Sequence, residues 1–305
     1  IGSNAIRGAQ ATGVDAIAIG GQSTSSGNYA TAMGRGAQAT DGEATAIGSR
    51  ATAGGATSTA IGRNSSAGGA ASFAGGGGAN ATGARSTALG VLANASGNSS
   101  TAIGDSAVSS GPQSTALGLS ADATAEHATA LGTRAQATAV NAVALGGASS
   151  TAEAAQASAA RATALGYGSA ASGDDSIALG DATASAERAT ALGYGSTASG
   201  DDSIALGEAT ASAVRATALG YGPAASGDDS IALGAAAAGG ERSTAIGYQA
   251  TVADNGQLGS IAIGSFSASS GQDAIALGTS TTATGIGSYA MGYFASSTSD
   301  NGIAI

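Results

Sequence analysis

The chain has little of what an ordinary globular core or a catalytic centre is built from. Its 305 residues include no cysteine, no tryptophan, three phenylalanines, two prolines and a single histidine, His127. Disulfide bonds are therefore excluded, a zinc site lacks nitrogen and sulfur ligands, and a histidine-based triad would depend on one residue. We expect no catalytic residue, no cofactor and no metal, and hence no enzyme.

Lysine is also missing, and long apolar runs are missing with it. The ten basic residues are all arginine, and the formal net charge is −10. A chain of this sign repels nucleic acid phosphates and anionic lipid, so neither is a favoured partner. No run approaches the ~20 apolar residues of a membrane helix. We therefore expect no nucleic acid partner and no direct membrane insertion by these residues.

What the chain has is glycine, 52 residues of it, in a regular pattern. The tetrapeptide Ile-Ala-Ile-Gly at 17–20 recurs as Thr-Ala-Ile-Gly at 45–48 and as Ile-Ala-Leu-Gly at 177–180. The glycine that closes this motif recurs in steps of 14 residues in the first half, and in alternating steps of 14 and 13 later. These motif glycines are Gly20, Gly34, Gly48, Gly62, Gly76, Gly90, Gly104, Gly118, Gly132, Gly146, Gly166, Gly180, Gly193, Gly207, Gly220, Gly234, Gly247, Gly264, Gly278 and Gly292.

The period predicts one repeat array rather than several domains. Alternation with period two and β-branched residues before each glycine indicate a strand, and the glycine permits the turn that ends it. Fourteen residues suffice for two short strands and two turns, stacked at ~4.8 Å per rung. We predict an all-β parallel solenoid of about 21 rungs over 1–305, a fragment that begins and ends in mid-repeat. Steps of 20 and 17 residues predict loops near 147–160 and 252–259.

The strand also predicts which side chains face the core. Side chains alternate between faces, so we expect the bulky residues three and one before each glycine to point inward, and Gly75 to interrupt this core. The small residues four and two before it then form an outer face that is suited to contact with another copy. The interface candidates are Ala18, Ala46, Ala88, Ala116, Ala144, Ala178, Ala205, Ala232, Ala262 and Ala276.

The repeated unit Ser-Ile-Ala-Leu-Gly-x-x-Thr at 176–183 resembles the repeat of the YadA-like head of trimeric autotransporter adhesins, over nearly the whole chain. The resemblance implies a left-handed parallel β-roll, assembled side by side as a homotrimer. It also implies display on the bacterial cell surface, outside the outer membrane, with stalk and anchor located C-terminally.

By this resemblance the function is that of an adhesin head, a virulence-associated protein that binds collagen, fibronectin, laminin or a host surface receptor multivalently. The alternatives are an ice-binding or other purely structural β-solenoid. A hexapeptide-repeat acyltransferase fits badly, because its repeat has six residues and it needs a catalytic histidine.

Three variable positions are candidates for function. Opposite charges alternate at the position five before the glycine, and we hypothesise an ion-pair ladder, within one chain or between chains, formed by Arg161, Asp175, Arg188, Asp202, Arg215, Asp229 and Arg242. Tyrosines that follow a motif glycine are candidates for ligand contact, at Tyr167, Tyr194, Tyr221, Tyr248 and Tyr293. The pairs Asp174-Asp175, Asp201-Asp202 and Asp228-Asp229 form an acidic row at a turn, interpreted as a solubility feature, with divalent cation binding or contact with basic host surfaces as the alternatives.

Overall fold

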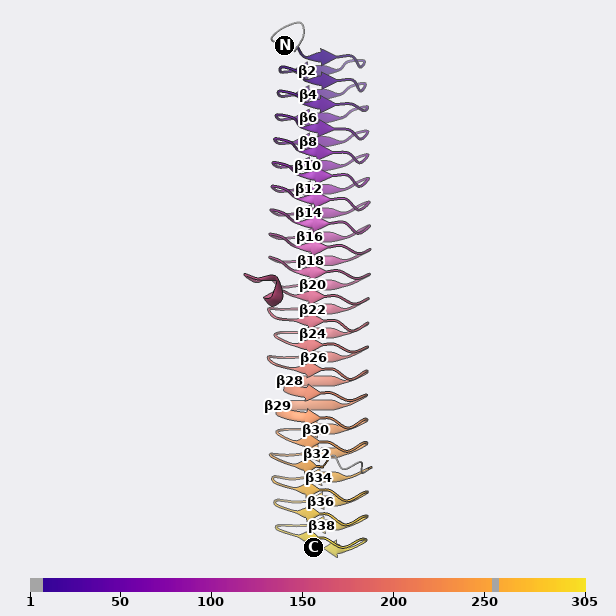
Figure 1. The fold of residues 1–305 in the computed structure, drawn as a ribbon, viewed down its shortest axis with the longest axis vertical. Coiled ribbons are helices and arrows are strands. Elements are labelled where there is room, and N and C mark those ends of the chain that lie inside the picture. Colours follow the sequence, from indigo (N-terminus) through magenta and orange to yellow (C-terminus); the bar gives the residue numbers. More distant parts are fainter. Residues whose placement is uncertain (1–7, 254–257) are drawn as a thin grey trace. The chain divides into compact units, whose positions relative to one another are not determined.

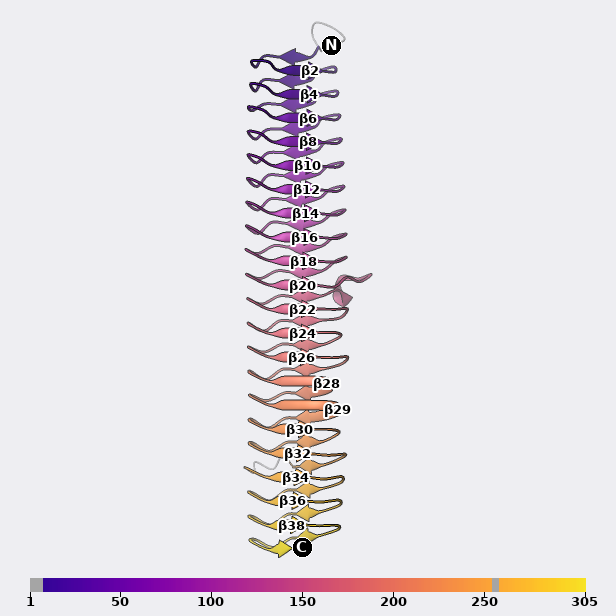
Figure 2. The same cartoon turned by 180° about the vertical axis from the view of Figure 1, so that it is seen from behind.

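The computed structural model describes residues 8–253 and 258–305, in two compact units, Ile1–Ser158 and Ala159–Ile305. In each unit the chain winds through successive parallel turns (Figures 1 and 2). The two units together comprise about 21 turns, all β apart from one short 3-10 helix. The parallel β-solenoid predicted from the period is confirmed.

Each turn of the first unit carries one strand of three residues and one of two. The three-residue strands are β2 (Ile17–Ile19), β4 (Thr31–Met33), β6 (Thr45–Ile47), β8 (Thr59–Ile61), β10 (Phe73–Gly75), β12 (Thr87–Leu89), β14 (Thr101–Ile103), β16 (Thr115–Leu117), β18 (Thr129–Leu131) and β20 (Val143–Leu145). The two-residue strands are β1 (Gln10–Ala11), β3 (Thr24–Ser25), β5 (Gln38–Ala39), β7 (Thr52–Ala53), β9 (Ser66–Ala67), β11 (Asn80–Ala81), β13 (Asn94–Ala95), β15 (Val108–Ser109), β17 (Asp122–Ala123), β19 (Gln136–Ala137) and β21 (Gln156–Ala157).

The second unit follows the same plan, except that two turns are drawn out into long strands. The strands that contain the motif are β22 (Thr163–Leu165), β24 (Ile177–Leu179), β26 (Thr190–Leu192), β28 (Ile204–Ala211), β29 (Thr217–Ala225), β30 (Ile231–Leu233), β32 (Thr244–Ile246), β34 (Ile261–Ile263), β36 (Ile275–Leu277), β38 (Tyr289–Met291) and β40 (Ile303–Ala304). The two-residue strands are β23 (Ala170–Ala171), β25 (Thr183–Ala184), β27 (Thr197–Ala198), β31 (Ala237–Ala238), β33 (Thr251–Val252), β35 (Ala268–Ser269), β37 (Thr282–Ala283) and β39 (Ser296–Ser297).

Strands pair with their equivalents one turn away, in register. Between β6 and β8, Thr45 is opposite Thr59, Ala46 opposite Ala60 and Ile47 opposite Ile61. Hydrogen bonds also join the bends of consecutive turns. The Gly48 amide, for example, donates to the Met33 carbonyl at 2.8 Å. Identical residues therefore stack in columns along each unit, and a single position of the repeat defines a whole column.

The core of each unit is built from alanine and serine. In β6, Ala46 is 0% exposed, Thr45 is half-buried, and Ile47 on the outer side is 36% exposed. The predicted orientation is therefore wrong: the small residues four and two before the glycine point inward, and the bulky ones point outward. The turns bring the two sheets so close together that methyl and hydroxymethyl groups fill the interior.

This correction applies to the interface candidates. Ala18 is half-buried. The others are 0% exposed inside their own chain: Ala46, Ala88, Ala116, Ala144, Ala178, Ala205, Ala232, Ala262 and Ala276. No other copy can reach a side chain that its own chain covers completely.

Gly75 also has a different role from the one expected. It lies one residue before the motif glycine, on the outer face of β10, and not in the core. A Cβ at Gly75 would lie 2.8 Å from Cε1 of Phe73 and 3.0 Å from Cδ1 of Leu89. The Phe73 ring occupies the space that isoleucine or leucine takes in other turns, so the glycine accommodates a large neighbour.

Backbone conformation reveals a seven-residue period inside each fourteen-residue turn. Positive φ recurs at Asp15, Gln22, Tyr29, Gly36 and Glu43, every seventh residue. Each half-turn places two small residues in the core and ends at such a left-handed position. Where the half-turn after the motif glycine begins with serine, its hydroxyl donates to the carbonyl of that glycine, as Ser65 does to Gly62 at 2.9 Å.

Two segments depart from the regular turn. The first contains the 3-10 helix η1 (Thr151–Glu153), where Ser150 Oγ donates to Glu153 at 2.9 Å, and it projects from the stack in Figure 1. The second corresponds to the loop expected near 252–259, of which 254–257 lie outside the described residues. Leu258, just after them, forms a parallel bridge with Glu241.

Candidate interaction surfaces

The outer sides of the motif-containing strands form an exposed hydrophobic surface, here called the apolar face. In the first unit its exposed hydrophobic residues, 36% to 49% exposed, are Ile17, Ile19, Met33, Ile47, Ile61, Leu89, Leu117, Leu131, Val143 and Leu145. In the second unit the equivalent residues, 38% to 52% exposed, are Leu165, Ile177, Leu192, Ile204, Leu219, Ile231, Ile263, Tyr289 and Met291. An apolar surface that repeats on every turn is typical of an interaction site.

The two-residue strands of the first unit carry a largely polar outer surface instead. Their outward positions include Thr24, Gln38, Thr52 and Ser66. Asn80 and Asn94, one turn apart, are joined by a side-chain hydrogen bond of 3.1 Å. This surface is suited to water, so the two outer sides of the roll differ in character.

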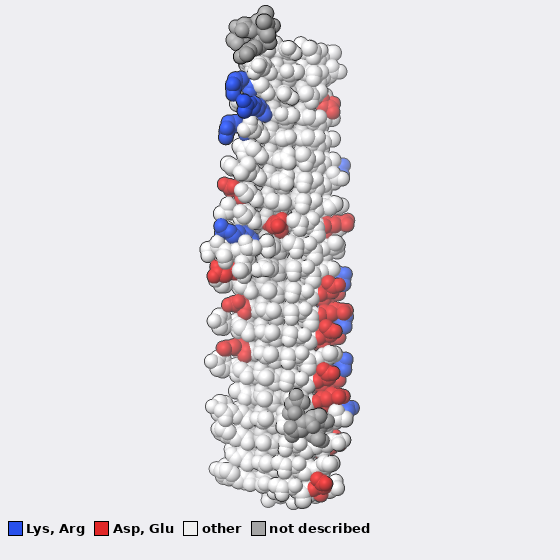
Figure 3. Space-filling view, in the orientation of Figure 1, with Lys and Arg blue, Asp and Glu red and all other residues white. Residues whose placement is uncertain are grey.

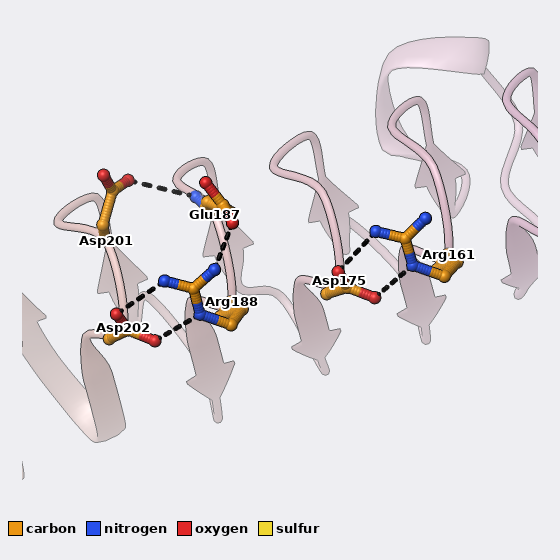
Figure 4. Close-up of polar contacts among 6 residues, drawn as sticks. All are labelled: Arg161, Asp175, Glu187, Arg188, Asp201 and Asp202. Atoms are coloured by element: carbon orange, nitrogen blue, oxygen red, sulfur yellow. Dashed lines mark hydrogen bonds and ion pairs between the residues drawn. The ribbon is translucent and has the colours of Figure 1, made fainter.

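Among the described residues, charged side chains five before a motif glycine form three discrete ion pairs with one another. Arg161 binds Asp175 through Nε–Oδ1 at 2.5 Å and Nη2–Oδ2 at 2.6 Å (Figure 4). Arg188 binds Asp202 in the same way, and Arg215 binds Asp229 with Nε–Oδ1 at 2.5 Å. Each pair joins two consecutive turns.

The pairs do not merge into a continuous ladder. Among the described residues, Asp175 forms no ion pair within 4.0 Å with Arg188, which instead also contacts Glu187 of its own turn. Arg242 contacts Glu241 at 3.5 Å. All seven residues of the hypothesised ladder have φ between 54° and 59°, so a left-handed backbone presents each side chain at the turn.

The ion pairs shift the pKa of each aspartate. The hydrogen bond from Arg161 lowers the pKa of Asp175 below its ordinary value, and Arg188 lowers that of Asp202 in the same way. Arg215 likewise lowers the pKa of Asp229. The positive charge of Arg188 also contributes at Asp175, so neighbouring pairs attract one another weakly.

The acids beside the ladder are bound to the backbone, which the sequence did not indicate. Oδ1 of Asp174 accepts the Ala160 amide at 3.1 Å, and Asp201 accepts the Glu187 amide at 3.3 Å. Asp228 accepts the Val214 amide at 3.1 Å. In each Asp-Asp pair the first aspartate holds the backbone of the preceding turn and the second holds its arginine. The described residues contain no group of three or more His, Cys, Asp or Glu that could hold a metal ion.

Tyr167, Tyr194 and Tyr221 are exposed, and each lies on the same turn as an arginine of the ion pairs, six residues after it. Tyr194 and Tyr221 are 74% and 76% exposed, and Tyr167 is 54% exposed. On the intervening turns the same position holds Asp181 and Glu208, both exposed. We call these five residues the tyrosine–acid column. In Figure 3, acidic side chains alternate with white bulges along one edge of the second unit, opposite the edge that carries the ion pairs.

The remaining tyrosines contact aromatic neighbours. Tyr248 packs edge-on against Phe266 one turn away, with ring centroids 5.4 Å apart, and Tyr293 packs against the adjacent Phe294 at 4.3 Å. Sequence reasoning identified the tyrosines but missed Asp181 and Glu208. Their signal was present, since both directly follow a motif glycine, as the tyrosines do.

No helix among the described residues has the length and hydropathy of a membrane span. Comparison with curated proteins finds no match. The family model described as YadA head domain repeat (2 copies) matches most of the chain, at residues 11–37, 25–51, 39–65, 95–121, 123–149, 157–183, 184–207, 211–237, 238–267, 257–281 and 283–305. With its in-register turns and the family repeat along most of its length, this chain belongs to the YadA head domain repeat family.

Proposed function

We propose that the chain is the head of a trimeric autotransporter adhesin, held on the bacterial surface outside the outer membrane, and that it attaches to host matrix or cells. Membership of the YadA head family implies adhesin-type function. The partners proposed are a matrix protein such as collagen, fibronectin or laminin, or a host surface receptor. Repeated weak contacts along many turns would combine into firm attachment through effective concentration. No catalytic step is part of this function.

The observation that carries the proposal is the apolar face. Ile47, Ile61 and their equivalents leave a large part of each side chain in contact with water on turn after turn. Burial of the exposed part would contribute on the order of 1 kcal/mol for each such residue. Because the contribution repeats with every turn, association along this face gains strength with length. We propose that left-handed rolls assemble side by side as a homotrimer through this face.

A second function has one observation in its favour. Threonines three before the glycine, such as Thr45 and Thr59, lie in register on the outer side. The sequence had led us to expect them in the core. A flat surface with regular outward threonines is the feature expected of an ice-binding solenoid. The neighbouring isoleucines and leucines, and the family membership, favour the adhesin. A thermal hysteresis assay separates the two functions, since an adhesin head leaves ice growth unchanged.

The test of the main proposal combines mass and binding. The mass of the purified chain in solution should be three times that of the single chain, and the chain should bind immobilised collagen, fibronectin, laminin or a host-cell glycan. Ile47→Glu together with Leu117→Glu places charge in the apolar face and should reduce assembly. The matched control is Thr52→Glu, on the polar side of the same unit. A monomer at micromolar concentration would refute the trimer.

A further inference from the structure

The tyrosine–acid column of the second unit has a regular geometry. Its five residues occupy one position of the repeat on consecutive turns. Glu208 and Tyr221 are direct partners in the parallel pairing of β28 with β29. The amide of Gly195, next to Tyr194, donates to the Asp181 carbonyl at 2.8 Å, which places those two turns side by side. Tyrosine and carboxylate therefore alternate along the surface, one residue for each turn.

A glycine with positive φ follows each tyrosine of the column, and at Gly168 it makes room for the acid of the next turn. Gly168, Gly195 and Gly222 have φ of 70°, 67° and 76°. A Cβ at Gly168 would lie 2.2 Å from Oδ1 of Asp181, so this carboxylate lies over the glycine, beside Tyr167. At Gly195 the nearest atom would be Cγ of Glu208, at 3.5 Å. Each acid therefore lies near the glycine that follows the tyrosine of the preceding turn.

The carboxylates of the column are not neutralised by the protein. Neither Asp181 nor Glu208 has an ion pair within 4.0 Å among the described residues, whereas the aspartates of the opposite edge bind arginines. Exposed carboxylates between aromatic rings attract cations in two ways. The carboxylate forms charge-assisted hydrogen bonds with guanidinium or ammonium, and the face of the ring attracts the same charge.

The spacing selects a particular form of cationic partner. Turns are ~4.8 Å apart, so equivalent tyrosine–acid sites recur at ~9.6 Å. In a polyproline II helix every third residue recurs at ~9.3 Å. We propose that the tyrosine–acid column binds an extended basic polypeptide segment that presents arginine or lysine at every third position. This inference rests on the proposed adhesive function, for which it specifies one class of partner.

Anionic occupants fit the column less well. Nucleic acids and anionic glycans carry the same sign of charge as the carboxylates. A second copy of the chain is a competing occupant, because Arg35, Arg50 and Arg63 lie after motif glycines in the first unit. Arg35 and Arg63 directly follow motif glycines two turns apart, which is also the spacing of the sites, so association between copies has to be measured alongside peptide binding.

The experiment uses the whole chain and labelled peptides of the form (Pro-Pro-Arg)n, with fluorescence anisotropy as readout. The first control peptide replaces arginine by glutamine, and the second has the same composition with its arginines clustered at one end. Binding should need the regularly spaced arginines and should weaken with added salt. Equal affinity for the glutamine peptide would overturn the role of charge. Equal affinity for the clustered peptide would overturn the role of spacing.

Four variants locate the site. Asp181→Asn with Glu208→Gln, and Tyr194→Ala with Tyr221→Ala, should each weaken peptide binding about tenfold or more. Glu43→Gln, an exposed acid of the first unit, should leave it unchanged. Ala235→Glu adds a carboxylate between Tyr221 and Tyr248 and should tighten binding several-fold. Unchanged affinity in both column variants, with thermal unfolding as in the wild type, would refute the proposal.

Two further outcomes separate this inference from the function on which it rests. A chain that forms trimers and binds matrix proteins but no basic peptide leaves the adhesin proposal in place and overturns the column. A monomer that binds nothing overturns both. If Asp181→Asn with Glu208→Gln abolishes association between copies and no peptide binds, the occupant is a second copy, which also refutes the peptide partner.

Discussion

The guanidinium of Arg188 binds the carboxylate of Asp202, fourteen residues ahead, through two parallel hydrogen bonds of 2.6 Å and 2.8 Å. Both residues have positive φ, 54° and 58°, and both occupy the same position of successive turns. The side chains are about half exposed, so solvent screens the pair and its effect on stability is modest. We propose that its greater effect is on register, because a slip by one turn would place arginine beside arginine.

Reversal of this charge tests that role. Asp202→Arg sets three arginines on consecutive turns, at positions 188, 202 and 215, and should lower the melting temperature measured by circular dichroism. Asp202→Asn is the matched control, because asparagine tolerates the left-handed backbone and adds no repulsion. A reversal variant that melts no lower than the asparagine variant would show that the alternation of charge does not contribute.

The same pairs predict a dependence on pH. Their hydrogen bonds from arginine lower the pKa of Asp175, Asp202 and Asp229 in the folded chain. The contribution of each pair to stability is therefore present above the unfolded aspartate pKa of ~3.9, and it is lost as the pH falls through the folded value. The triple Asp→Asn variant should melt below the wild type at pH 7, and the two should converge in acid. A constant difference at all pH values would contradict this account.

The pKa of Asp122 is shifted in the opposite direction, upward. It lies between Val108 and Gln136 on the outer side of the two-residue strands, and its Oδ1 is buried without a hydrogen-bond partner among the described residues. Burial raises the pKa of this carboxyl. The ionised form is thus disfavoured in the folded chain, and stability is lost as the pH rises through the unfolded and then the folded pKa.

Asp122→Asn should consequently raise the melting temperature at pH 7 and have little effect in acid, where the aspartate is neutral. The hydrogen bond between Asn80 and Asn94 at the same position shows that asparagine is accepted in this column. Asp181→Asn, an exposed acid, serves as the control and should leave the melting temperature unchanged. A stabilisation by Asp122→Asn that persists at low pH would exclude charge burial as its cause.

The orientation of the core gives a prediction about packing. Ala46→Leu adds three carbon atoms at a fully buried position between sheets that have no spare volume. Such overpacking costs typically 1–3 kcal/mol, and the free energy of unfolding should fall by at least that amount in denaturant titrations. Thr52→Leu, on the outer side of the next strand, should change stability by less than ~0.5 kcal/mol. Equal tolerance of both substitutions would show that the alanine columns are not the core.

Much of this fold can be predicted from the sequence, and the reason is its repetition. The spacing of the motif glycines fixes the turn length, and Thr-Ala-Ile before Gly48 identifies a strand. Orientation was not predicted correctly, because the usual association of bulk with burial fails in a roll as thin as this one. Ala46 and Ile47 alternate in the same way in either orientation. The distance between the sheets decides between the two, and that distance depends on the turns.

The candidate sites were predictable in part. The alternation of Arg188 with Asp202 was visible, but its division into separate pairs depends on rotamers and on local competition from Glu187. The role of Asp201 as a backbone acceptor depends on turn geometry. Asp181 was not predicted, because a single acid after a glycine gives no signal by itself. Its importance depends on the next turn, which places Tyr194 at the same position. Lateral neighbours of this kind are fourteen or thirteen residues apart and appear only when the turns are aligned.

The seven-residue half-turn also has a consequence for how such a chain can change in length. Deletion or duplication of a whole turn restores every column, so the array can grow or shrink in its gene by whole turns without redesign of its interior. Turns of thirteen and fourteen residues both keep the columns, but a longer insertion has to leave the stack, as the segment around Thr151–Glu153 does. Natural variants of this protein should therefore differ by complete turns or by surface loops. The number of turns before a surface feature then determines where along the array that feature lies.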